Sequence, residues 1–295
     1  MNAGFIAMTA LLAVPAGAAL LLVLLSGYRL GARVNVGAAL SSLLAAVTLF
    51  GARPEANLYL RVDDFNLYLI VLNNLVSFTT SVFSASYIAH ELETGRLTPV
   101  YLRFYHAMYQ ALLFAMNLAL LANNIGLLWV AIELATLITV LMVGLYRTRA
   151  ALEAAWKYFI LGSLGIALAL FGTILVYLAA QPVMGEGLPA MAWDQLLARA
   201  SAFDPALLNL AFVFLLLGYG TKAGLAPLHA WLPDAHAEGP TPISAILSGL
   251  LLNVALYAVL RFKMLMSANP HALAPGPLMV GLGLLSLLFA GLMLY

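Results

Sequence analysis

Long hydrophobic runs separated by short polar segments follow one another along the whole chain. A helix needs about 20 apolar residues to cross roughly 30 Å of hydrocarbon, because each residue adds 1.5 Å. A membrane β-barrel would instead show short alternating segments. The pattern therefore predicts an all-α, polytopic helical membrane protein with about nine transmembrane helices. The runs are 5–25, 34–50, 65–89, 104–122, 125–146, 154–180, 206–232, 242–260 and 277–295.

The composition supports a membrane protein and excludes several classes of function. Hydrophobic residues make up 64% of the 295 residues and charged residues 8%, whereas a soluble domain has about 45–50% and about 25%. Nucleic-acid binding needs a strongly basic face, and the net charge here is only +1. The chain has no Cys, which excludes disulfides, thiolate-held clusters and attached c-type haem.

The distribution of Lys and Arg suggests an orientation. No Lys or Arg precedes the first run, and Arg29 and Arg33 follow it, which is opposite to the charge order of a cleaved signal peptide. Six basic residues fall in the odd-numbered loops and five in the even ones, so we expect the N-terminus outside and a multi-pass protein of a prokaryotic inner membrane. The last run reaches Tyr295 without a flanking charge, so we expect a longer protein; a natural end at a helix is the alternative.

Glu133 is an acidic residue deep within the fifth run. An ionised group at mid-bilayer costs about 2.5–3.5 kcal/mol even on the lenient insertion scale, and such groups usually face protein or water and have a partner. Nine residues into the run, Glu133 lies about 12 Å from its start. Thr136 shares its helix face. We predict a functional carboxylate; a purely structural one is the alternative.

Lys222 lies deep in the seventh run and close to helix-breaking residues. Gly220 and Gly224 have the spacing that allows close helix approach, and Pro227 cannot donate a helical hydrogen bond. Transporters build mid-membrane ion sites at broken helices. We therefore predict an unwound turn near residues 225–231 and a Lys222 that approaches Glu133 directly or through one water. A lysine held by a single structural carboxylate is the alternative.

Three further residues are weaker candidates. Lys157 lies four residues after Glu153, so an ion pair along one helix is the simple explanation. His229 follows the predicted break and could relay protons, since its ordinary pKa is near 6.5. Asn253 is strongly polar within the eighth run and could be a neutral relay or a link between helices. No axial histidine pair for haem and no metal site are evident.

Four motifs, at residues 129–136, 155–159, 220–236 and 239–245, carry a resemblance to a known family. The chain resembles the antiporter-like proton-conducting subunits shared by complex I, Mrp-type antiporters and membrane-bound hydrogenases, and is most similar to the hydrogenase-4 component F type. The resemblance implies that Glu133, Lys157 and Lys222 are the conducting residues of the fifth, sixth and seventh helices. Several relatives carry Lys or His where this chain has Asn253, which cannot take up a proton near pH 7.

The resemblance also implies an organisation in repeats. Residues 1–103 would form three N-terminal helices, residues 104–265 a proton-conducting repeat of helices four to eight, and residues 266–295 the start of an incomplete second repeat.

The function expected from the resemblance is proton translocation in a complex I-like redox assembly of the hydrogenase, formate hydrogenlyase or NADH:quinone oxidoreductase type. This chain would be a non-cofactor subunit, with no cofactor or metal of its own. Its partners would be other membrane and peripheral subunits, the lipid bilayer and protons, with no nucleic acid. The alternatives are an Mrp-type cation/proton antiporter subunit and a membrane partner of inorganic-carbon uptake.

Overall fold

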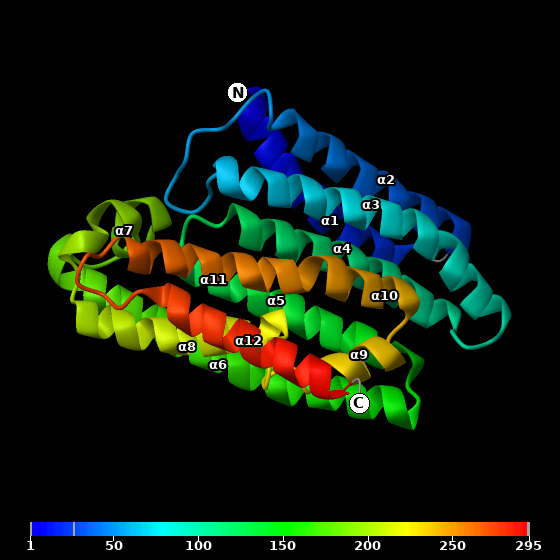
Figure 1. Ribbon diagram of the computed structural model, residues 1–295. Coiled ribbons are helices and arrows are strands. Elements are labelled where there is room, and N and C mark those ends of the chain that lie inside the picture. Colours follow the sequence, from blue (N-terminus) through cyan, green and yellow to red (C-terminus); the bar gives the residue numbers. More distant parts are fainter. Residues whose placement is uncertain (1, 26, 294–295) are drawn as a thin grey trace.

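The computed structural model describes residues 2–25 and 27–293, and in this part of the chain nine helices are long and apolar enough to cross a membrane. They lie side by side as an elongated bundle (Figure 1). No β-strand occurs in these residues beyond two isolated bridges, so the predicted all-α membrane fold is confirmed. The long helices are α1 (Ala3–Leu24), α2 (Tyr28–Thr48), α3 (Asp64–Glu93), α4 (Pro99–Leu121), α5 (Ile125–Val143), α6 (Arg149–Met184), α8 (Pro205–Ala223), α11 (Leu252–Ser267) and α12 (Pro275–Met293).

Three short α-helices lie between the long ones: α7 (Trp193–Arg199), α9 (Leu232–Glu238) and α10 (Thr241–Ile246). A π-helical segment, Leu247–Leu251, joins α10 to α11, so the predicted eighth run is a composite of three pieces that together span Thr241–Ser267. The second helix begins at Tyr28, six residues before its predicted run. Residues 294–295 of the ninth run lie outside the described part.

The predicted break in the seventh run is confirmed. α8 ends at Ala223, nine residues before the run does, and α9 begins only at Leu232, so the unwound turn expected near residues 225–231 is present. Lys222 lies in the last helical turn before this break.

Close packing of α6 against α8 depends on glycines. A Cβ added at Gly218 would lie 2.5 Å from the backbone nitrogen of Ala169, and one at Gly172 would lie 2.9 Å from the carbonyl oxygen of Ala211. Only glycine allows backbones to approach so closely. Gly220, which the sequence suggested for this role, instead faces Leu225 of its own chain segment.

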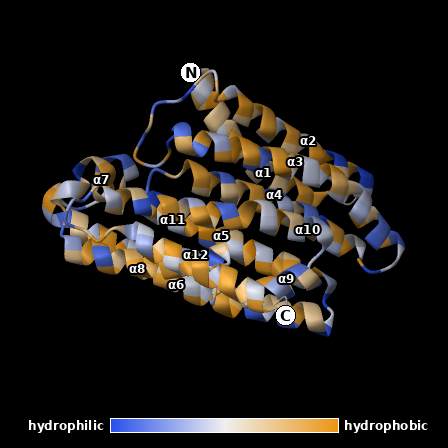
Figure 2. Ribbon diagram, in the orientation of Figure 1, coloured by the Kyte–Doolittle hydropathy of each residue, from blue (hydrophilic) through white to orange (hydrophobic). Residues whose placement is uncertain are grey.

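Apolar residues cover the lengths of the helices and polar residues gather at their two ends (Figure 2). Many leucines remain exposed, for example Leu284 at 62% and Leu287 at 71% on α12. Such surfaces suit lipid or another membrane subunit.

Candidate functional site

The break after α8 is built by a glycine in a left-handed conformation. Gly224 has φ +75° and its N–H donates to the carbonyl of Thr221, while the N–H of Leu225 donates to the carbonyl of Gly220. This pattern is a Schellman C-cap, which ends a helix and satisfies its last carbonyls. Pro227 lies four residues beyond Ala223 and is exposed, so Gly224 and not Pro227 stops the helix.

Trp231 fills the space that the break opens. Its side chain is fully buried, its ring stacks on Tyr158 with 4.4 Å between centroids, and its indole N–H donates to the carbonyl of Thr221 at 2.9 Å. The N–H of Ala226 donates to the hydroxyl of Ser286 on α12 at 3.0 Å. Side chains from α12 and from the segment itself thus satisfy backbone groups at the break, as irregular structure at membrane depth requires.

Lys222 projects into the centre of α5, α6 and α8. The residue is fully buried, and its ammonium lies 5.0 Å from the centroid of the Tyr158 ring. Gly162 of α6 makes room for it, since a Cβ there would lie 2.5 Å from Lys222 Nζ. Within residues 2–25 and 27–293 this nitrogen has no hydrogen-bond partner. A buried charge without a partner is costly, so the site is suited to a group that loses and regains its proton.

Glu133 of α5 lies one helical turn from Thr136. The methyl group of Thr136 lies beside Gly162, 3.5 Å from the position of an added Cβ, and so close to Lys222. One carboxylate oxygen of Glu133 is buried, with no partner in the described residues. Glu133 and Lys222 are near enough to interact electrostatically. They do not form an ion pair within 4.0 Å in the part of the chain that the structure covers. We predicted contact either directly or through one water, and the direct contact is not seen.

Lys157 lies apart from this centre. Its side chain is half exposed, and the ammonium pairs with Glu153 and with Asp234, each at 2.8 Å. Asp234 belongs to α9, so the lysine links α6 to the helix that follows the break. In the described residues Lys157 forms no ion pair with Glu133, and its conducting role stays a prediction.

The remaining two candidates, His229 and Asn253, have other neighbours than Lys222. His229 is half-buried within the segment after the break, where its ring faces Phe289 at 6.1 Å. Asn253 is exposed and donates to the carbonyl of Gly249, one turn earlier in its own helix, at 2.6 Å. In the described residues neither side chain is hydrogen bonded to Lys222.

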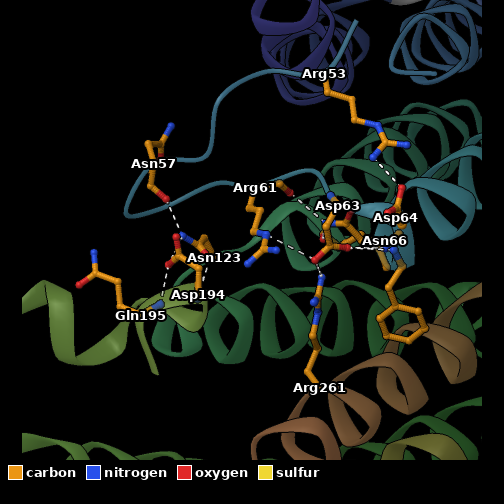
Figure 3. A network of polar contacts seen from close by, with 12 residues as sticks. Arg53, Asn57, Arg61, Asp63, Asp64, Asn66, Asn123, Asp194, Gln195 and Arg261 are labelled. Atoms are coloured by element: carbon orange, nitrogen blue, oxygen red, sulfur yellow. Dashed lines mark hydrogen bonds and ion pairs between the residues drawn. The ribbon is translucent and has the colours of Figure 1, made fainter. Parts of the chain in front are cut away.

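Sequence reasoning missed a polar cluster at the end of the bundle where α5 begins (Figure 3). Arg261, which the sequence placed in a loop, lies inside α11 with 4% exposure and pairs with Asp63 at 2.7 Å. Arg61 approaches the same carboxylate at 3.4 Å. Beside this pair, Asn123 donates to Asp194 at 3.0 Å. The cluster joins the N-terminal helices to α5, α7 and α11.

A second set of polar residues was also missed, among α2, α3 and α4. The amide oxygen of Asn117 accepts from Asn73 and Asn74 at 2.9 Å each, and Gln110 donates to Asn35 at 2.8 Å. The sequence did contain a signal for these residues, because their polar amides interrupt apolar runs. Hydrogen bonds of this kind hold membrane helices together.

Comparison with known proteins agrees with this architecture. Residues 122–294 match the transmembrane family described as NADH:quinone oxidoreductase/Mrp antiporter, TM. The chain belongs to this family. The matched region begins just before α5 and contains the broken helix together with Glu133 and Lys222, which we call the Glu133–Lys222 centre.

Individual relatives extend the likeness. The chain is 60% identical over 276 residues to a hydrogenase-4 component F homolog of Methylacidiphilum infernorum (isolate V4), covering 94% of this chain and 58% of the relative. Its fold is similar to a chain of the archaeal membrane-bound sulfane sulfur reductase, with TM-score 0.77, 22% identity, and coverage of 92% and 55%. A chain of respiratory complex I from Thermus thermophilus gives TM-score 0.65, 26% identity, and coverage of 85% and 52%. The chain thus spans little more than half the length of these relatives.

Proposed function

We propose that this chain is a proton-translocating membrane subunit of a complex I-like redox assembly, resident in a prokaryotic inner membrane. The observation that carries the proposal is Lys222, a fully buried lysine without a hydrogen-bond partner in the described residues, in the last turn of a broken helix and within electrostatic reach of Glu133. Membership of the family and the likeness to a hydrogenase-4 component F homolog support it.

The mechanism that we propose is a switch between a close and an open Glu133–Lys222 pair. Two unit charges about 4 Å apart at an effective dielectric near 20 attract by about 4 kcal/mol. Closing the pair favours a protonated Lys222, and opening it favours release of that proton. Movement of the segment after α8, driven by a partner subunit, would change the separation, because Lys222 lies two residues before the break.

Other groups have supporting roles in this proposal. Lys157, His229 and Asn253 would lie on the routes to and from the centre, with water between them. Electrons would be handled by partner subunits, since this chain has no Cys and is proposed to hold no cofactor. Residues 1–103, 104–265 and 266–295 remain our proposed division into N-terminal helices, conducting repeat and second repeat.

The test is Lys222→Ala in the assembled complex, in proteoliposomes or inverted vesicles. Proton uptake is measured beside redox turnover. We expect uptake to be abolished while the complex still assembles and its partners keep their cofactors, because Glu133 can take up a proton when its partner is removed. Lys263→Ala, a half-buried lysine on α11, is the matched control and should pump normally.

Wild-type pumping per turnover by Lys222→Ala would make the lysine structural and overturn the proposal. Exchange of Na⁺ for protons in vesicles without any redox substrate would instead favour the antiporter alternative.

A further inference from the structure

An apolar groove with a cationic mouth lies between α4, α5 and α6, on the side of α5 away from its N-terminal end. Its volume is about 640 Å³. Both α5 and α6 line it with residues spaced i, i+3, i+4 and i+7, which share one helix face. These are Leu137, Val140 and Leu141 on α5 with Gly144 directly after it, and Leu152, Ala155, Trp156 and Phe159 on α6; α4 adds Val100, Tyr101 and Phe104.

The walls of the groove are apolar and open to the surroundings of the bundle. Leu137 is 42% exposed, Leu141 51% and Trp156 63%. On helices that cross a membrane, such walls must be covered by hydrocarbon or by another apolar surface, because water does not reach them at this depth.

The length of the groove indicates what kind of molecule it can hold. From Leu137 to Arg147 the chain advances about 15 Å along the helix axis, which equals the depth of one leaflet of a hydrocarbon core about 30 Å thick. A transmembrane helix of a partner, about 30 Å long, would extend well beyond the groove. An acyl chain of one leaflet matches it.

At the mouth of the groove, Arg147 carries a positive charge that can bind an anion. Arg147 follows α5 and the short turn Gly144–Tyr146, in a left-handed conformation with φ +54°. Its guanidinium carbon lies 4.8 Å from the centroid of the Tyr101 ring. No acidic side chain comes within 4.0 Å of it in residues 2–25 and 27–293. A guanidinium stacked on an aromatic ring keeps its N–H edge free for a phosphate.

We propose that this groove is a specific site for one anionic phospholipid, with an acyl chain between α5 and α6 and the phosphate on Arg147. Arg147 and Tyr101 lie at one end of the groove, where a phosphate would bind, and the leucines lie below them, where an acyl chain would lie. The site is separate from the Glu133–Lys222 centre, so the proposal stands whatever ion that centre moves.

The test is native mass spectrometry of the purified assembly after mild delipidation, with phosphatidylglycerol or phosphatidylcholine of the same acyl chains added back. We expect the wild type to retain phosphatidylglycerol about fivefold better, as one arginine near a membrane surface would give. Arg147→Gln should remove this preference. Arg149→Gln, an exposed arginine two residues away that does not line the groove, should keep it.

A second pair of variants tests the groove itself. Leu137→Trp fills its deep end and should reduce retention of both lipids, whereas Leu210→Trp, at an equally exposed apolar position on α8, should leave retention unchanged. Equal retention of the two lipids by the wild type, or full retention by Leu137→Trp, would overturn the proposal. Capture of a neighbouring subunit in place of lipid by a photo-cross-linker at Leu141 would do the same.

Discussion

The fit of Lys222 against a glycine of α6 predicts that one added methyl group should disturb proton transfer. A Cβ at Gly162 would lie 2.5 Å from Lys222 Nζ and 3.6 Å from its Cε. Ordinary contact begins near 3.4 Å, so in Gly162→Ala the ammonium must withdraw by about 1 Å. The lysine can make this movement because it is the flexible end of a long side chain. The backbone of α6 should therefore remain in place.

The size of the effect follows from Coulomb's law. Two unit charges about 5 Å apart, at an effective dielectric near 20, attract by about 3 kcal/mol, and 1 Å more removes about 0.5 kcal/mol. That change is about a factor of two in a protonation equilibrium. Withdrawal from Glu133 would weaken proton uptake, and a shift toward Glu133 would slow release. We therefore expect at least about a twofold loss of protons translocated per redox turnover.

The assay is the proton uptake of inverted vesicles, normalised to redox turnover, together with the thermal unfolding midpoint. Alanine favours a helix over glycine by about 0.5–1 kcal/mol, so Gly162→Ala should be as stable as the wild type or slightly more stable. The control is Gly37→Ala on α2, where an added Cβ meets nothing within 4 Å. Normal pumping by Gly162→Ala would refute our account of Lys222, and so would equal losses in both variants.

Two other predictions concern stability, both read from thermal unfolding by tryptophan fluorescence. Asp63→Asn should keep the helix cap but leave Arg261 buried without its anion, at a cost of about 3 kcal/mol. Burial alone would raise the pKa of Asp63, but Arg261, Asn66 and Arg61 together lower it; the ion pair thus stabilises the fold above about pH 4, and the difference between variant and wild type should shrink as the pH falls below that value. If the difference in stability between Asp63→Asn and the wild type stayed unchanged down to pH 3, the ion-pair explanation would be wrong. Gly224→Ala forces a left-handed alanine and should cost about 1–2 kcal/mol, whereas an unaltered midpoint would mean that α8 ends differently.

The sequence determined the number and class of the helices. Membrane spans can be read from a chain because lipid forces every spanning segment to be apolar and to satisfy its own backbone. Glu133 and Lys222 could be chosen for the same reason, since a charge in an apolar run stands out. The broken seventh helix was also visible, although the sequence did not show that Gly224 rather than Pro227 ends it.

Only the tertiary structure decided which residues meet. Lys157 and Lys222 look alike in sequence, yet one pairs at the surface with Asp234 and the other is buried beside Gly162. Arg261 reads as a loop residue until Asp63, almost two hundred positions earlier, supplies its partner. Hydropathy measures how each residue prefers lipid or water, one position at a time, whereas partners and cavities depend on how distant helices pack. The place where α8 ends was likewise decided by a left-handed Gly224 and by Trp231, which fills the space beyond it.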